Sequence, residues 1–194
     1  MMDYKFLYLR ISTIILNPVK AWEAIYSENR PIRYVRDSFF FPLIILVAIS
    51  AFLGSWLFTR SALSDVYSVL VGIKYFILLF FVIYASAFIF KEITNALDLG
   101  HDFTLSFKII AYSVAPFLIC QIISRLFESF IFINVLALYG LYIFWIGIEK
   151  MLNPPEHKKM PLLISSTVVF VGTFVAANWL LTQVIDRLYF AFFA

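Results

Sequence analysis

The sequence predicts an all-α integral membrane protein: a five-span transmembrane helical bundle preceded by short amphipathic interfacial helices. The chain has 194 residues, of which 63% are hydrophobic and only 14% are charged, whereas about a quarter of the residues in a soluble domain are charged. Several apolar segments reach the length of about 20 helical residues that crosses a bilayer. The charged residues gather between these segments. The net charge of +3 is small and dispersed, so we expect no nucleic-acid partner.

The chain opens with a head, residues 1–38, which we expect on the cytoplasmic side of the bundle formed by residues 39–194. The stretch "ILNPVKAWEAI" predicts a short helix within the head. Asn17 can cap this helix, and Pro18 suits its first position because proline presets φ and needs no N–H partner there. The helix then presents Trp22 on one side.

Two positions are compatible with this short helix. In the first, it lies in the membrane interface as an anchor, with Trp22 at the headgroup level. Nearby arginines would then face the anionic cytoplasmic leaflet: Arg30, Arg33 and Arg36. In the second, the helix packs over the inner mouth of the bundle. Both alternatives make it a marker of topology.

Five segments are predicted to span the membrane, at approximately Phe39–Thr59, Val69–Phe90, Ile109–Ile123, Phe127–Ile148 and Leu162–Val184. The third is short, and extending it back to Phe103 gives a full-length span. Only "SRLFES" separates the third span from the fourth. We therefore expect these two spans to form a tight hairpin.

Orientation follows from the Lys and Arg residues near the span ends, which resist translocation. Most of the 15 basic residues share one side if the amino terminus is cytoplasmic. That side holds Lys5, Arg10, Lys20, Arg30, Arg33, Arg36, Lys91, Lys108, Lys150, Lys158 and Lys159, and the other holds Arg60, Lys74, Arg125 and Arg187. We expect the amino terminus inside and the carboxyl terminus outside.

Small residues at helical spacing predict close helix packing within the bundle, because lipid tails already satisfy apolar side chains. They are Ser50 and Gly54 in the first span, Gly140 and Gly147 in the fourth, and Gly172 and Ala176 in the fifth. We favour packing over a substrate path for these faces.

Polar groups inside the spans are few, and each is a functional hypothesis because it is costly in hydrocarbon. Lys74 lies near the outer end of the second span, where snorkelling to the surface is favoured over a buried functional ion. Asn134 and Asn178 need partners at membrane depth, so they either lock two helices together or line a polar cavity. We favour the lock.

Catalytic chemistry has little support. His101 and His157 fall in connections without Cys, His or Glu at ligand spacing, and no HExxH, GxSxG or glycine-rich phosphate loop is present. We therefore expect a protein without catalytic residues, metal ligands or a cofactor.

The third span contains "IIAYSVAPFLI", in which Tyr112, Ser113 and Pro116 resemble the Tyr-(Ser/Cys)-x-x-Pro signature of the Yip-one family of Ypt/Rab-interacting membrane proteins. The proline removes one helical hydrogen bond and is expected to kink the span. The opening "NPVKAWEAI" is similar to that of bacterial members. The resemblance implies a five-span bundle with a cytoplasmic amino terminus.

The resemblance weakens before the first span. Eukaryotic members carry an acidic Asp-Leu-Tyr-Gly-Pro-like stretch, and only Asp37 and Pro42 of "YVRDSFFFPLI" echo it. Binding of small GTPases is therefore not carried over. The short head and connections resemble bacterial members, which implies a multi-pass protein of the bacterial inner membrane.

Two functional hypotheses follow. The first is a non-catalytic membrane organiser or adaptor, with membrane lipids, other membrane proteins or a second copy of itself as partners. The second is a transport protein for a small molecule, an ion or a lipid. In that hypothesis a polar cavity surrounds the kinked third span and is lined by Tyr112, Ser113, Pro116, Asn134 and Asn178.

Overall fold

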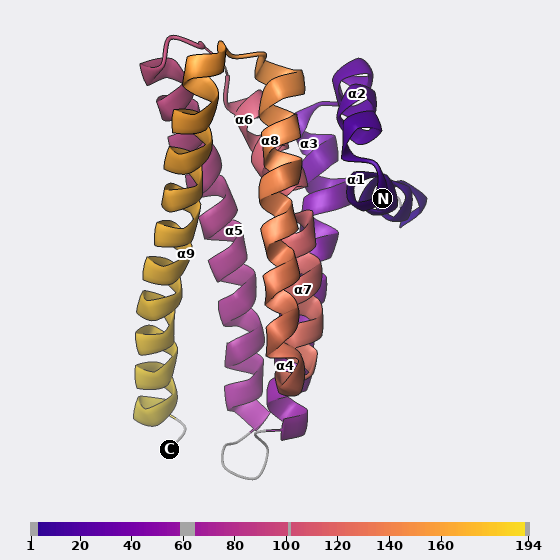
Figure 1. Cartoon of the computed structure of the whole chain (residues 1–194). Coiled ribbons are helices and arrows are strands. Elements are labelled where there is room, and N and C mark those ends of the chain that lie inside the picture. Colours follow the sequence, from indigo (N-terminus) through magenta and orange to yellow (C-terminus); the bar gives the residue numbers. More distant parts are fainter. Residues whose placement is uncertain (1–3, 59–64, 101, 193–194) are drawn as a thin grey trace.

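Every regular element is a helix in the computed structural model, which describes residues 4–58, 65–100 and 102–192 (Figure 1). The predicted all-α class is therefore confirmed. Four helices are long and apolar enough to span a membrane, and a bent helix pair adds a fifth span if it counts as one. The expected positions of Thr59, Arg60 and His101 fall outside the described residues.

The elements run in this order: α1 (Tyr4–Leu16), α2 (Pro18–Glu28), α3 (Ile32–Val35), the π-helical turn η1 (Arg36–Phe40), α4 (Phe41–Phe58), α5 (Asp65–Ala96), α6 (Phe103–Ser113), α7 (Ala115–Leu126), the 3₁₀ helix η2 (Glu128–Leu138), α8 (Tyr139–Leu152) and α9 (Glu156–Phe192). We call the end of the bundle near α2 the head end and the opposite end the far end. The described part of α9 finishes at the far end (Figure 1).

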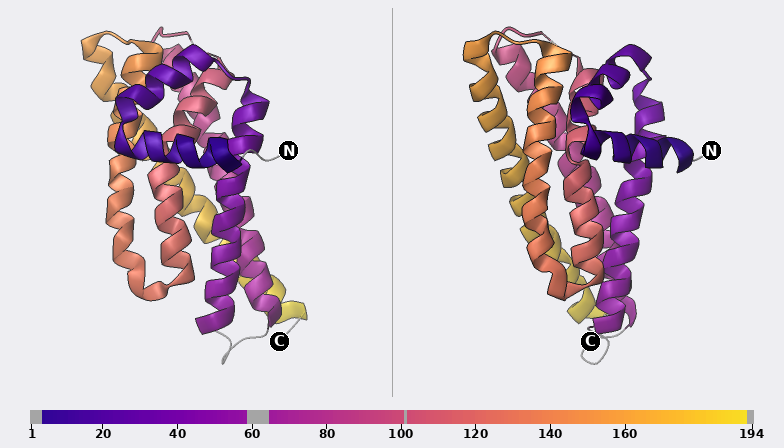
Figure 2. Two further views of the ribbon diagram at one scale, coloured as in Figure 1. Left: turned by 90° about the vertical axis from the view of Figure 1, so that its right-hand side faces the viewer. Right: turned by 45° about the vertical axis from the view of Figure 1, so that its right-hand side comes forward.

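The head consists of α1 and α2, joined at a capped turn. Asn17 Oδ1 accepts a hydrogen bond from the Lys20 N–H at 3.2 Å, and Pro18 is the first residue of α2, as the sequence predicts. The helix α1 runs across the bundle, nearly perpendicular to the spans (Figures 1 and 2). The first span begins at Ile32, several residues before the expected Phe39, because α3 and η1 continue directly into α4.

The second span, α5, makes the most extensive helix contacts in the bundle. The helix α4 packs against α5 and α7, α6 against α8, and α9 mainly against α5. The expected hairpin is present, because the chain leaves α7 at Phe127 and returns directly through η2 alongside it. The largest fully buried side chains include Trp22, Phe39, Phe90 and Tyr112, so head and spans share one hydrophobic core.

Glycines mark the close approaches between helices. A Cβ atom added at Gly54 would lie 1.9 Å from the backbone oxygen of Arg125, and one added at Gly140 would lie 2.8 Å from that of Ser113. The packing predicted for the first and fourth spans is therefore confirmed. It is wrong for Gly172, where an added Cβ would meet no described atom within 4 Å, because α9 turns this face outward, away from α5.

Candidate functional site

The first candidate region is the junction between the head and the spans. Trp22 is fully buried, and its Nε1–H donates a hydrogen bond to the carbonyl oxygen of Ile143 at 2.9 Å. Gly147 lies one turn further along α8, and a Cβ there would come within 2.6 Å of the Trp22 ring. The indole also meets the ring of Tyr112 edge-on, with centroids 6.0 Å apart. Trp22 therefore packs between α2 and α8 at the head end of the bundle.

The residues expected to accompany Trp22 as an anchor are placed differently from one another. Pro18 is buried in the head. Arg30 is partly exposed; its guanidinium lies 4.4 Å from the centre of the Tyr34 ring, and its Nε donates to Glu28. Arg36 pairs with the neighbouring Asp37 at 2.7 Å, and Arg33 is exposed. Arg33 is thus exposed, whereas the partly exposed side chains of Arg30 and Arg36 are each bonded to a carboxylate.

Glu28 accepts hydrogen bonds from two arginines and ties α1 to the end of α2. Arg10 Nη2 lies 2.6 Å from its Oε1, and Arg30 Nε lies 2.7 Å from its Oε2. Burial by itself raises the pKa of Glu28, but the hydrogen bonds from Arg30 and Arg10 outweigh it, and the net result is a lowered pKa. The ionised carboxylate therefore stabilises the folded head.

We expect the Glu28→Gln variant to be less stable than the wild type by about 1 kcal/mol at neutral pH, because charge-assisted bonds are lost from a partly solvated site. A lowered folded-state pKa gives stability that is present above 4.5, the ordinary value, and is lost as the pH falls through the folded value. Thermal unfolding in detergent across this range should show the two proteins converging at low pH. A difference that stays constant with pH would contradict this role of the carboxylate.

The second candidate region is the bend in the third span. The helices α6 and α7 meet at Val114 at an angle of 45°. Pro116 is the second residue of α7 and has no N–H for the carbonyl of Tyr112, which would be its partner in an uninterrupted helix. The ladder resumes when the Leu118 N–H bonds to the Val114 carbonyl at 2.9 Å. Because of the bend, Ser113 on α6 and Phe117 on α7 do not lie on one face of a continuous straight helix.

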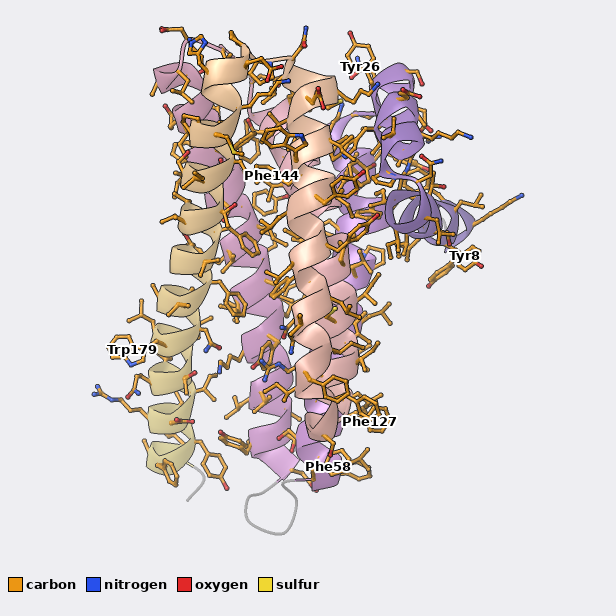
Figure 3. All side chains as sticks on the ribbon, in the orientation of Figure 1. Tyr8, Tyr26, Phe58, Phe127, Phe144 and Trp179 are labelled. Carbon is orange, nitrogen blue, oxygen red and sulfur yellow. The ribbon has the colours of Figure 1, made fainter. Side chains whose placement is uncertain are left out.

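A cleft of about 210 Å³ opens between this bend, α8 and α9. Its lining is almost wholly apolar and includes Phe117, Gly140, Phe144, Phe170 and Phe174. Phe144 projects from α8 toward α9 (Figure 3). The Ser113 side chain, 4% exposed, also lines the cleft, and its Oγ finds no hydrogen-bond partner among the described residues.

A polar cluster lies further toward the far end. Gln121 Nε2 donates to Asn134 Oδ1 at 3.1 Å, and Arg125 Nε donates to Gln121 Oε1 at 3.1 Å. Lys74 Nζ donates to Thr182 Oγ1 on α9 at 2.7 Å. The Arg125 guanidinium also lies 4.5 Å from the ring of Tyr75, the residue after Lys74. The cluster therefore connects α5, α7, η2 and α9.

These contacts separate the polar residues that the sequence grouped together. Tyr112 is buried against Phe39 and Trp22 in the head-end core, and Ser113 lines the cleft. Asn134 accepts a hydrogen bond from Gln121 across the hairpin, between η2 and α7. Asn178 lies on α9 with its Oδ1 buried and without a described partner.

Sequence reasoning missed the polar contacts of Lys74 and Arg125. Lys74 is only 9% exposed and bonds to Thr182 rather than reaching the membrane surface. The i, i+4 spacing of Gln121 and Arg125 on α7 was the available signal. Thr182, the partner of Lys74, is 108 positions away in the sequence, and no local spacing indicates that contact.

Comparison with known proteins identifies the family. No curated protein and no solved structure matches the chain. The Yip1 domain matches residues 12–178, which cover the end of α1, all of α2, the bent third span and most of α9. The resemblance drawn from Tyr112, Ser113 and Pro116 is thus confirmed, and the chain belongs to the Yip1 domain family of multi-span membrane proteins.

Proposed function

We propose that this protein is a non-catalytic organiser or adaptor of the bacterial inner membrane, and that it presents its head end to partner proteins in the cytoplasm. The observation that carries the proposal is a set of polar contacts between segments far apart in the sequence. Lys150 on α8 pairs with Glu23 on α2 at 2.9 Å, and Lys108 on α6 donates to Asn29 at 3.1 Å. Together with the buried Trp22, these contacts fix the head to α6 and α8, so that the head and the adjacent helix ends form one rigid unit.

The positions of exposed side chains support this orientation. Tyr8, which is 72% exposed, projects from α1 toward the far end, whereas Tyr26 projects from α2 in the opposite direction (Figure 3). A helix that lies across the spans with exposed aromatic residues on its membrane-facing side suits the interface. Tyr26 then faces the cytoplasm, among the ion pairs of the head end.

Site-specific photo-crosslinking in cells tests the adaptor role. A photoreactive residue at Tyr26 is expected to capture a reproducible protein partner, because this position faces away from the membrane. The matched control is the same residue at Trp179, which is 61% exposed and points away from α9 toward lipid (Figure 3). Equal capture at both positions, or recovery of the protein alone as a monomer in mild detergent, would count against the proposal.

The competing transport hypothesis is tested with the purified protein in liposomes. The cleft beside the bend is apolar, so it gives ions no polar path through the described part of the bundle. We expect ion flux and lipid scrambling at the level of empty vesicles. Flux that requires the protein would overturn the organiser role in favour of transport.

A further inference from the structure

The apolar cleft and the polar cluster are consecutive parts of one surface. On each of three elements, a residue that lines the cleft is followed toward the far end, one helical turn away, by a polar residue that belongs to the polar cluster or, in the case of Asn178, lies one turn from its member Thr182. The pairs are Phe117 and Gln121 on α7, Phe174 and Asn178 on α9, and Ala137 and Asn134 on η2. Residues four apart in an α-helix, and three apart in a 3₁₀ helix, share a face. The cleft therefore leads directly to the polar side chains.

The polar part carries an excess of positive charge. Among the side chains that the structure describes, no carboxylate oxygen lies within 4 Å of the Lys74 ammonium or the Arg125 guanidinium. The Asp186 carboxylate on α9 instead accepts a hydrogen bond from the Tyr67 hydroxyl at 3.4 Å. A largely buried cation without a counter-ion is costly. An anionic group bound there would lower that cost.

Donors and acceptors remain available along this surface. The Lys74 ammonium has three N–H groups, and its hydrogen bond to Thr182 uses one of them. The Lys74 side chain is at least nine-tenths buried, as is that of Ser113 in the cleft. Ser113 Oγ and Asn178 Oδ1 are buried without described partners. The two remaining N–H groups of Lys74 fit an anionic head, and Asn178 Oδ1 can accept a hydrogen bond from a hydroxyl group of the same ligand. Ser113 lies away from this head, at the other end of the cleft.

The shape of the cleft indicates the rest of the ligand. Its α9 wall runs from Ser166 to Phe174, a length of about 12 Å at the helical rise. Its volume of about 210 Å³ is smaller than the pockets of compact drug-sized ligands. Leu141 and Val171 at its margin are 38% and 53% exposed, so the cleft opens toward surrounding lipid. A narrow apolar space of this kind suits a hydrocarbon chain.

We infer that the cleft and the polar cluster bind an anionic glycerophospholipid from the far leaflet. Its phosphate lies between Lys74 and Arg125, and one acyl chain follows α9 through the cleft toward Ser113. Arg125 stands in the last turn of α7 beside the hairpin, so the phosphate can stay close to the membrane surface. The inference goes beyond the organiser role and does not depend on it, since adaptors and transporters alike can hold a resident lipid.

Lipid retention by the purified protein tests the charged part. The protein is exchanged into nanodiscs of phosphatidylcholine with a minor share of phosphatidylglycerol, released into mild detergent and weighed by native mass spectrometry. We expect the wild type to retain phosphatidylglycerol and the Lys74→Gln, Arg125→Gln double variant to retain at least about tenfold less. The control variant Arg187→Gln removes an exposed charge near the far end of α9. It should retain as much phosphatidylglycerol as the wild type. Equal retention by all three proteins would overturn the site.

A second pair of variants tests the acyl chain without changing charge. Ala137→Phe fills the cleft, whereas Val135→Phe, on the exposed side of η2, leaves it open. We expect only the first to lose phosphatidylglycerol. If Ala137→Phe retains the lipid, or if inorganic phosphate displaces it from the wild type, the site binds an anion alone and the lipid assignment is wrong.

A measurement on the wild type covers the case in which a variant does not fold. A phosphatidylglycerol analogue with a diazirine in the acyl chain should label Phe170 and Phe174, which line the cleft, more heavily than Trp179 on the outward face of α9. Fragmentation of the labelled peptides by mass spectrometry locates the modified residues. The same analogue made on phosphatidylcholine should not show this preference. Uniform labelling by both analogues would contradict the inference.

Discussion

Replacing Trp22 by alanine is expected to detach the head from the bundle and to lower the free energy of unfolding by about 3–5 kcal/mol, as is typical for a fully buried tryptophan. The change empties the space beside Gly147 and removes the hydrogen bond to the Ile143 carbonyl. Thermal unfolding in detergent should show the loss of stability. Amide exchange across residues 4–35 should become faster, because α2 loses its principal contact with α8.

The matched control is Trp179→Ala, which removes an indole of the same size from the outward face of α9, where it is 61% exposed. Its stability and its exchange in the head should stay close to those of the wild type. If the two alanine variants behave alike, Trp22 does not hold the head in place. If Trp22→Ala changes stability but leaves the exchange of the head untouched, the loss arises elsewhere in the core.

Replacing Gly54 by alanine is expected to separate α4 from α7 and to cost about 3 kcal/mol or more, at the upper end of overpacking effects. The new Cβ would lie 1.9 Å from the Arg125 carbonyl oxygen, and a backbone atom of a packed helix has no rotamer to relieve the contact. The change would also displace the hairpin at Phe127. We expect a lower yield of monodisperse protein and a lower midpoint of thermal unfolding.

Gly172→Ala makes the same chemical change in another membrane-length helix, at a position where the added methyl group meets no described atom within 4 Å. Because alanine favours a helix over glycine by about 1 kcal/mol, this variant should be as stable as the wild type or slightly more stable. A similar loss in both variants would mean that glycine flexibility matters rather than the close approach at Gly54.

The bend at Pro116 and the cap at Asn17 illustrate what local sequence can predict. Proline lacks an N–H and asparagine offers a side-chain acceptor, so their effects are decided within about one turn of chain. The hairpin after α7 is also local, since few residues separate the two helices. The membrane class follows from composition, because apolar segments of this length have few other stable environments.

The positions of Trp22, Lys74 and Gly172 were not predictable in the same way. A tryptophan such as Trp22 can lie among lipid headgroups or pack against a glycine of another helix. The glycine that it packs against, Gly147, is 125 residues later in the chain. Lys74 could extend to the surface or bond across to α9, and Gly172 could face a neighbour or lipid. In a bilayer, both faces of a span are apolar, so hydrophobic periodicity does not say which face turns inward.

The sequence by itself therefore determined the all-helical membrane class, the approximate spans, the capped helix of the head, the bend in the third span and the Yip1 family. Only the tertiary structure showed that Trp22 of the head packs against α8. It also showed that the polar residues divide between the hydrogen bond across the hairpin, the apolar cleft and the polar cluster around Lys74 and Arg125. Finally, it showed that the Gly172 face of α9 turns away from the bundle. The reason is the range of the interactions. Caps, kinks and span lengths depend on neighbouring residues, whereas docking and clefts depend on which distant helix surfaces meet.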